Sequence, residues 1–371
     1  MDILCHGVNV DDDGLLHYFY NCQNPLDTHR TGNAGLQVKL GEERLPLNVA
    51  VYKEFCESSP YFLTYSNQCQ LGLLDKRDNS IVDIFCPEKA PEWYEKDVEY
   101  EKEKTQIGKF VLLEGDFTAI MSITSGCFYF NKGQPCKFCA IGADAVSSYD
   151  INCRKSMILS ALSVVAEDSA ITNFHLTGGN TFDSDRGALA YVKFVETLRK
   201  KRKDALVAVE IPPPEKYVQK DIFSKLKAIG VDSITINMEF WNDDVRRELM
   251  PIKGNISKAE YISAYCTALD IFGPNKVTCG FIVGVEDIEN TYQGIDYLTN
   301  LGVVTEVYPF KPNNGSSMVK HPLTNVEDIL KVSLFADAAM KKKRIAPDLC
   351  SGCVKCGACG LTQELIKINT N

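Results

Sequence analysis

The chain has 371 residues, of which 45% are hydrophobic and 24% are charged, so it is long and apolar enough to bury a substantial core. Its formal net charge of -9 opposes the electrostatic attraction on which binding to phosphate backbones depends, so a nucleic-acid partner is not expected. The apolar runs are much shorter than the roughly 20 residues of a membrane helix, and no export signal is visible at the start. A cytoplasmic protein without a membrane partner is therefore expected.

The first 115 residues are predicted to form a mixed α+β segment that carries no chemical motif and whose role is unknown. Within this segment, residues 71–85 are predicted to form a β-hairpin that turns at Asp78 and Asn79. The polar, charged stretch of residues 87–104 is expected to be a surface connection to the next domain.

From residue 118 onward, strand-length apolar runs alternate with helical patterns. Strands are expected at residues 118–124, 172–176, 206–211, 233–238, 277–283 and 303–310. Helices are expected at residues 155–168, 188–200, 216–229, 258–272, 288–301 and 326–342. Repeated βα units form parallel sheets, so the sequence predicts an α/β fold, a partial (β/α)6 TIM-like barrel over residues 116–345. In such barrels the chemistry belongs at the carboxyl ends of the strands.

Seven of the fifteen cysteines fall into two tight groups, which indicates metal binding rather than a disulfide framework. The first group, Cys127, Cys136 and Cys139, follows the first predicted strand. Three thiolates hold three irons of a [4Fe–4S] cube and leave the fourth iron open to a ligand. A three-ligand zinc site or buried thiols are the alternatives. The other eight cysteines are interpreted as small buried hydrophobes.

The second cysteine group lies in a cysteine-rich C-terminal extension, residues 346–371. Its members stand at three-residue intervals: Cys350, Cys353, Cys356 and Cys359. This spacing indicates a metal site. A [4Fe–4S] cluster, a structural zinc site and a mononuclear iron site all fit four closely spaced thiolates, and the residues leave the three open.

The first cysteine group resembles the signature of the radical S-adenosylmethionine (SAM) superfamily, which has three cysteines and an aromatic residue just before the last one. Phe138 occupies the aromatic position, which in the family lies near the adenine of SAM. The family's open iron binds the amino and carboxylate groups of the methionine portion. The eight residues between Cys127 and Cys136 make this gap longer than the family's usual one.

A segment after the second predicted strand also resembles this family. It consists of Thr177, Gly178, Gly179 and Asn180, and its counterpart contacts the methionine amino group through exposed backbone. The two glycines allow a close backbone approach, and Asn180 replaces an acidic residue. His175, which precedes the segment inside an apolar strand, is interpreted as a satisfied core histidine.

Two further segments extend the resemblance to the fourth and fifth predicted strands. Asn237 and Glu239 lie where the family binds the ribose hydroxyls, and Arg246 is expected to pair with the methionine carboxylate. Gly284 belongs to a segment that resembles the family's adenine-lining segment.

The resemblance implies an enzyme that reductively cleaves SAM at the first cluster to a 5′-deoxyadenosyl radical. This radical would abstract hydrogen from a small-molecule or peptide substrate in a biosynthetic or maturation step, with an electron donor such as ferredoxin or flavodoxin. Many members carry an auxiliary cluster, which here would face the barrel mouth and relay an electron, anchor the substrate or donate sulfur. Residues 313–317 are expected to line the substrate end. The alternative is a non-radical iron–sulfur electron carrier or a zinc-stabilised binding protein.

Overall fold

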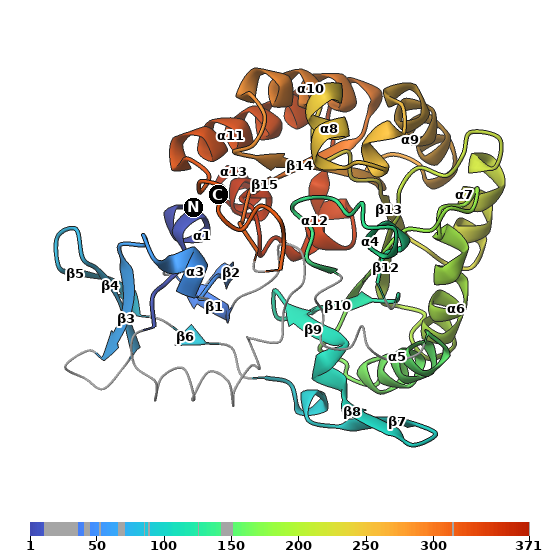
Figure 1. Cartoon of the computed structure of the whole chain (residues 1–371), viewed down its shortest axis with the longest axis horizontal. Coiled ribbons are helices and arrows are strands. Elements are labelled where there is room, and N and C mark those ends of the chain that lie inside the picture. Colours follow the sequence, from blue (N-terminus) through green and yellow to red (C-terminus); the bar gives the residue numbers. More distant parts are fainter. Residues whose placement is uncertain are drawn as a thin grey trace.

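The computed structural model describes residues 1–10, 36–40, 45–51, 53–65, 71–84, 86–87, 90–124, 126–141, 151–313 and 315–370. Figure 1 shows that its largest part is a sheet curled into an open half-barrel, with helices around the outer side. The partial TIM-like α/β barrel that the sequence predicts is therefore confirmed. None of the described helices is long and apolar enough to cross a membrane.

Six parallel strands form the barrel wall in chain order. They are β10 (Thr118–Ser122), β11 (Asn173–Thr177), β12 (Leu206–Glu210), β13 (Ser233–Thr235), β14 (Val277–Val283) and β15 (Val304–Pro309). Each neighbouring pair in this series is parallel. All six predicted strands are present. We call the carboxyl ends of these strands the mouth of the barrel and the amino ends its floor.

A seventh strand, β9 (Val111–Glu114), pairs antiparallel with β10, so the sheet order is β15-β14-β13-β12-β11-β10-β9. The chain reverses between these two strands at Gly115 and Asp116, which both have a positive φ, 59° and 68°. The sequence analysis did not predict β9. The barrel sheet thus begins within the residues assigned to the N-terminal segment.

The outer helices largely match the predicted ones. They are α5 (Ile151–Val165), α6 (Val192–Lys201), α7 (Gln219–Ala228), α9 (Lys258–Phe272), α10 (Ile288–Leu301) and α11 (Val326–Lys342), with the unpredicted α8 (Asp243–Leu249) between β13 and α9. The helices α9, α10 and α11 have the predicted bounds. Each is capped by a side chain that accepts a backbone N–H from the first turn, Ser257, Asp287 and Asn325 respectively.

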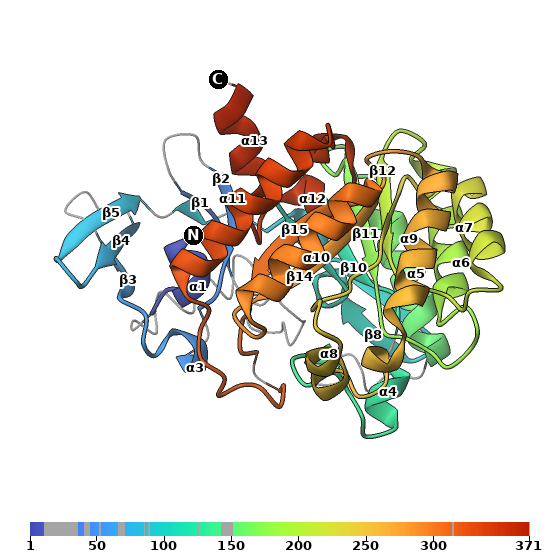
Figure 2. The same cartoon turned by 90° about the horizontal axis from the view of Figure 1, so that it is seen from above.

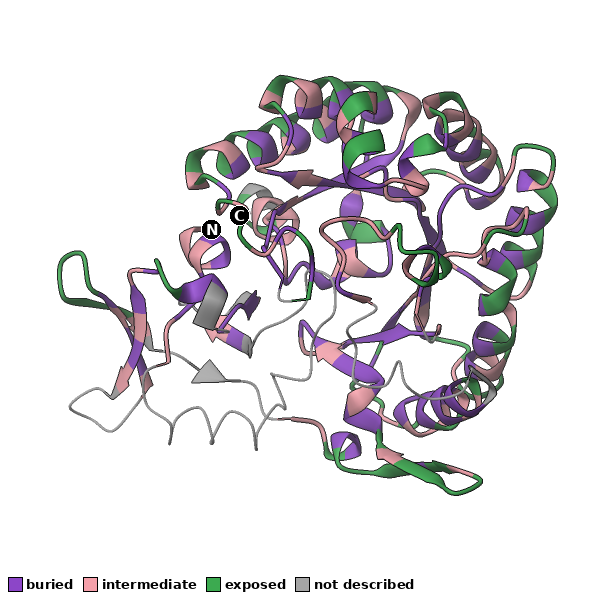
Figure 3. Cartoon of the chain, viewed as in Figure 1, coloured by how far each residue is buried: buried purple, intermediate pink, exposed green. Residues whose placement is uncertain are grey.

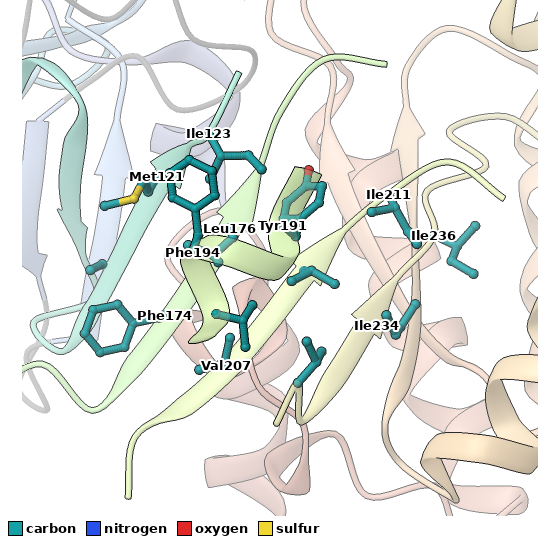
Figure 4. Packing of buried hydrophobic residues seen from close by; sticks show 14 of the residues in the cluster. Met121, Ile123, Phe174, Leu176, Tyr191, Phe194, Val207, Ile211, Ile234 and Ile236 are labelled. Carbon is teal, nitrogen blue, oxygen red and sulfur yellow. The ribbon is translucent and has the colours of Figure 1, made fainter. Parts of the chain in front are cut away.

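The main core lies between the outer face of the sheet and these helices. Figure 4 shows Phe194 of α6 near Phe174 and Leu176 of β11, and all three side chains are buried. Figure 3 shows the same pattern around the barrel, where the helix faces toward the sheet are buried. Because side chains alternate along a strand, His175 points to the other face, into the barrel. The wall thus separates an apolar outer core from a more polar interior.

The described residues of the N-terminal part form three small antiparallel sheets. Their strands are β1 (Leu36–Leu40), β2 (Leu45–Val49) and β6 (Cys86–Pro87) in the first; β3 (Tyr61–Tyr65), β4 (Leu71–Asp75) and β5 (Ser80–Ile84) in the second; β7 (Asp97–Tyr100) and β8 (Glu103–Gln106) in the third. Short helices are α1 (Asp2–His6), α3 (Lys53–Cys56), η1 (Glu92–Tyr94) and η2 (Ile107–Lys109). The predicted hairpin is confirmed as β4 and β5, while Phe85 lies outside the described residues.

The expectation that residues 87–104 are a surface connection to the next domain is wrong for part of this stretch. Trp93 and Tyr94 of this stretch are buried in the main core, and the indole Nε1 of Trp93 donates a hydrogen bond to Asp168 at 3.1 Å. The mostly polar composition of the stretch gave no indication that these two aromatic residues are buried. The strands β7 and β8 that follow them form a hairpin.

Asn48 of β2 links the N-terminal part to both edges of the barrel sheet. Its side-chain Nδ2 donates to Glu114 of the edge strand β9 at 3.3 Å. Its carbonyl accepts from Nζ of Lys311, just after the opposite edge strand β15, at 3.3 Å. Its backbone N–H donates to the carbonyl of Ala358 in the C-terminal extension at 2.9 Å. The strand β2 therefore bridges the opening of the half-barrel.

The C-terminal extension closes the floor. It contains η7 (Pro347–Leu349), α12 (Cys353–Cys356) and α13 (Thr362–Thr370). Figure 1 places α12 inside the curve of the sheet. Figure 2 places α12 and α13 toward the opposite end of the barrel from α8 and from α4 (Phe128–Asn131), which follows the mouth end of β10. The expectation that this extension faces the mouth is therefore wrong.

Hydrogen bonds from the first residues of two strands hold the extension in the floor. Asn173 of β11 receives the N–H of Gly352 at 2.8 Å and donates its Nδ2 to the carbonyl of Gly352 at 2.9 Å. Ser233 of β13 accepts the N–H of Ser351 at 3.2 Å. A Cβ at Gly352 would lie only 2.6 Å from both Ala208 and His175, so glycine allows this close approach.

Candidate functional site

A cavity of about 260 Å³ lies inside the barrel and is lined from both ends. Two groups of cysteines line it: Cys127, Cys136 and Cys139 at the mouth, and Cys353, Cys356 and Cys359 at the floor. We call them the mouth trio and the floor trio. Two cysteine groups that are far apart in the sequence thus share one cavity.

The loop after β11 lies against Cys127, the first cysteine of the mouth trio. The N–H of Asn180 points at Sγ of Cys127 at 3.4 Å, and the carbonyl of Asn180 accepts the N–H of Phe128 at 3.0 Å. A Cβ at Gly179 would lie 2.5 Å from Cα of Cys127, a distance that real side chains do not adopt. Glycine at this position is therefore required for the two loops to meet.

Thr124, which the sequence analysis did not single out, fixes the same loop from the end of β10. Its Oγ1 accepts the N–H of Gly179 at 2.6 Å and would lie 2.9 Å from a Cβ at Gly178. Thr177, Gly178, Gly179 and Asn180 all line the cavity. The predicted segment thus presents its backbone to the cavity beside the cysteines.

The last two cysteines of the mouth trio flank an aromatic wall. Phe138 lines the cavity and makes an edge-to-face contact with Phe240, with ring centroids 5.7 Å apart. Burial raises the pKa of the Cys136 thiol to about 12 and raises that of Cys139 as well. Since metals bind thiolates, a metal group held at this site would have to displace protons from the buried thiols.

Asn237 and Glu239 line the cavity at the end of β13, as predicted. The amide of Asn237 is engaged by protein groups, because its Nδ2 donates to Glu210 at 3.0 Å and its Oδ1 accepts the N–H of Gly280 at 2.8 Å. Glu239 has a φ of 69°, which non-glycine residues rarely adopt, and such strain is concentrated at functional sites.

Lys253, at the start of η6 (Lys253–Asn255), pairs with Glu239 inside the cavity, and sequence reasoning missed it. Its Nζ lies 2.9 Å from Oε1 of Glu239, and both side chains are largely buried. Burial opposes a charge on Lys253, but the nearby Glu239 carboxylate outweighs it and raises the pKa of the lysine well above its ordinary value. The mouth therefore contains a charged, preformed ion pair.

Two of the residues predicted to bind SAM do not line the cavity. Arg246 is fully buried, with its guanidinium bonded to Asp243 at 3.2 Å and to the carbonyl of Ile256 at 2.8 Å. These contacts hold α8 in place, so the expected pairing with a ligand carboxylate is not supported by the geometry. Gly284 faces Thr324, whose Oγ1 would lie 2.5 Å from a Cβ at this position. Lys253 is instead a cationic side chain that reaches the mouth.

Polar side chains form a layer between the two trios. Nε2 of His175 lies 3.1 Å from Oε2 of Glu210, so one ring nitrogen of this histidine has the hydrogen-bond partner that the sequence analysis expects. The His175 ring also lines the cavity. Burial alone would raise the pKa of Glu210. Its hydrogen bond and charge interaction with His175, together with other partners, hold this pKa below its ordinary value. Tyr308 lines the cavity and donates a hydrogen bond to Glu306, whose pKa burial raises to about 7. Asn313 of the predicted substrate-end loop also lines the cavity, whereas Asn314 lies outside the described residues.

The four C-terminal cysteines do not act as one group. Cys350 is fully buried in a cluster with Val304 and Met340, and its Sγ lies 3.6 Å from Oγ of Ser233. It is not among the residues that line the cavity. Within the part of the chain that the structure describes, no three histidine, cysteine, aspartate or glutamate side chains converge as ligands of a single metal ion.

These features define the chain as an α/β-barrel protein with cysteine thiols at both ends of an interior cavity. Residues 121–295 match the sequence profile of the radical SAM superfamily. These residues form a radical SAM domain, and the members of this superfamily use SAM and an iron–sulfur cluster. No curated protein sequence matches the chain significantly.

Solved structures with a similar chain fold include radical SAM enzymes. The chain is similar to methylornithine synthase (PylB), with 14% identity over 64% of each chain and a TM-score of 0.47. It is similar to HydG, a maturase of the [FeFe]-hydrogenase, with 16% identity over 66% of this chain and 54% of that one and a TM-score of 0.47. A radical SAM methyltransferase from Sphaerobacter thermophilus shares 14% identity over 81% and 80%, with a TM-score of 0.43. The chain thus spans less than two thirds of the length of the first two.

Proposed function

We propose that the mouth trio binds a [4Fe–4S] cluster and that SAM occupies the mouth of the cavity beside it. When bound, these groups supply reductive cleavage of SAM to a 5′-deoxyadenosyl radical, which abstracts hydrogen from a small-molecule or peptide substrate. The observation that supports this most directly is that three thiols and the backbone of residues 177–180 line one cavity. A ferredoxin or flavodoxin would deliver the electron from outside.

The residues at the mouth fit such a group. The N–H of Asn180, aimed at Sγ of Cys127, stabilises a thiolate there by a charge-assisted hydrogen bond. Phe138 offers a flat apolar surface for the adenine. Glu239 offers a carboxylate to the ribose hydroxyls, and Lys253 holds that carboxylate in place. Gly179 lets the two mouth loops approach each other closely beside Cys127.

The substrate would lie in the polar layer below SAM. His175, Glu210 and Tyr308 supply hydrogen-bonding groups that fix the orientation of a polar substrate. The C-terminal cysteines would hold an auxiliary cluster that relays an electron, anchors the substrate or donates sulfur to it. All three roles fit a position across the cavity from SAM.

Product formation by the anaerobically reconstituted protein tests this proposal. With dithionite and SAM, we expect 5′-deoxyadenosine from the wild-type chain and none above background from the variant with Cys127, Cys136 and Cys139 all changed to Ala. Cys266→Ala is the matched control. The prediction that Cys266 is buried is wrong, and this exposed cysteine of α9 does not line the cavity. Verified iron and sulfide without 5′-deoxyadenosine would refute the radical reaction and favour an electron carrier.

A further inference from the structure

The floor of the barrel differs from a four-cysteine metal site, although the sequence supplies four cysteines. Cys353 and Cys356 stand three residues apart on α12, so they share one face of this short helix. Cys359 follows after Gly357, whose φ of 72° turns the chain back. All three line the cavity. The structure thus brings three thiols, and not four, to the interior.

Cys350 is separated from the other three by its own packing. Its side chain is fully buried among Val304, Met340 and Val354, and its sulfur lies next to Oγ of Ser233 at the start of β13. The neighbouring backbone is fixed as well, because Ser351 and Gly352 are bonded to Ser233 and Asn173. To turn Cys350 into the cavity, these hydrogen bonds would have to break.

A second observation at the floor points to a missing ligand. Nδ1 of His175 is buried, with the whole residue only 1% exposed, and it has no hydrogen-bond partner among the described residues. This ring stands beside Gly352, the residue before Cys353, and it lines the same cavity. Buried polar atoms almost always have a partner, so an orphaned nitrogen here indicates a group that the floor is built to hold.

We infer that Cys353, Cys356 and Cys359 hold a second iron–sulfur cube with one iron free of cysteine, and that this iron faces the substrate layer. Cys350 is a packing residue. This inference rests on the proposed function, because it places the substrate between the two trios. It assigns substrate anchoring to the floor, since three thiolates would leave one iron of a cube open. His175 and Tyr308 line the same cavity as these three thiols.

Iron binding at the floor can be measured separately from iron binding at the mouth in a full-length variant that lacks the three mouth cysteines. The variant with Cys127, Cys136 and Cys139 changed to Ala is reconstituted anaerobically with ⁵⁷Fe and sulfide. We expect it to retain about four irons per chain, as one cube requires. Adding Cys350→Ala should leave the iron content and Mössbauer spectrum unchanged, whereas adding Cys353→Ala, Cys356→Ala or Cys359→Ala should reduce the iron to background. Loss of iron from a folded Cys350→Ala variant equal to that of Cys353→Ala would overturn the assignment.

An exogenous ligand tests the open iron without any change at Cys350. Cyanide added to the chain without the mouth trio should alter the Mössbauer signal of one iron in four. Three outcomes contradict the inference: no response to cyanide, a response that appears only after His175→Ala, or zinc in place of iron. Circular dichroism distinguishes loss of a ligand from loss of the fold. Formation of 5′-deoxyadenosine by the wild-type chain is measured in parallel, so failure of the radical reaction is distinguishable from a closed floor.

Discussion

The mouth and the floor of this barrel each present three thiols to one cavity, yet they are built differently. At the mouth, two long loops meet at Gly179, and a buried ion pair, Lys253 with Glu239, stands beside them. At the floor, a short helix is clamped by backbone hydrogen bonds to Asn173 and Ser233. The mouth thus relies on charge and loop contacts, which suit a ligand that comes and goes. The floor relies on fixed backbone bonds, which suit a permanent group.

Among the changes that distinguish the mouth from the floor, replacement of Lys253 is expected to have the largest effect on stability. In Lys253→Met, the carboxylate of Glu239 is left buried without its cation, which typically costs about 3–5 kcal/mol. We expect a matching fall in the free energy of unfolding and weaker SAM binding, measured by urea denaturation and equilibrium dialysis. The control is Lys331→Met, because Lys331 and Glu327 form an exposed pair on α11. Equal losses in both variants would contradict a specific role for charge at the mouth.

The next largest effect is a pH dependence of stability that arises from Glu306 of β15. Its pKa is about 7 in the folded protein against an ordinary 4.5, so the folded state binds a proton more tightly than the unfolded chain. Stability should therefore fall as pH rises from about 4.5 to about 7, by about 3 kcal/mol in all. Glu306→Gln should remove this slope and be the more stable protein at pH 8.

Unfolding by urea at several pH values under anaerobic conditions measures the Glu306 effect. The exposed Glu327 on α11 supplies the control, Glu327→Gln, which should retain the wild-type slope. A Glu306→Gln protein whose stability still falls between pH 5 and pH 7 would show that another group causes the dependence.

A smaller effect is expected from Gly179→Ala at the mouth. The added methyl group overlaps the backbone of Cys127, and overpacking of this kind costs about 1–3 kcal/mol. The loops should move apart, with loss of iron from the mouth but not from the floor, as read by iron content and by 5′-deoxyadenosine formation. Gly72→Ala is the matched control, because its nearest neighbour would lie 3.4 Å from the new Cβ. Full iron content in Gly179→Ala would count against a close approach of the loops.

The smallest effect is expected from Asn173→Ala at the floor. This change removes two hydrogen bonds to Gly352, each worth about 0.5–1.5 kcal/mol net. The C-terminal extension should become more susceptible to proteolysis while the barrel stays folded. Asn300→Ala on α10 removes an exposed hydrogen bond to Asp296 and should have no such effect. Unchanged proteolysis of the extension in Asn173→Ala would show that other contacts hold the floor.

Periodic patterns made the barrel predictable from the sequence. The helices α9, α10 and α11 and the strand β14 have the predicted bounds, because long amphipathic or continuous apolar runs end at clear capping residues. The strand β9 was missed since its four residues show no period of their own and gain their place by pairing with β10.

The site was predictable only where a motif carried it. The mouth trio and the glycine segment are recognisable in the sequence, although the gap between Cys127 and Cys136 is longer than usual, and both line the cavity. Lys253 and Glu210 belong to no motif, so only the fold reveals their partners. Arg246 looked like a ligand for a carboxylate, but Asp243 three residues earlier already supplies one. No local pattern indicates from which end of a barrel a later segment will enter, so the floor trio was misplaced.

The order in which the chain is synthesised affects how the cavity closes. Asn48 bridges the opening of the half-barrel, and the C-terminal extension closes its floor. Chains fold from the N-terminus as they are synthesised, so β2 and all three mouth thiols emerge long before Gly352 can reach Asn173. The floor of the cavity is therefore the last part to close, when the C-terminal extension packs against the strands. A polypeptide that ends before the floor would keep all three mouth thiols, yet its cavity would be open to oxygen and water from the floor side.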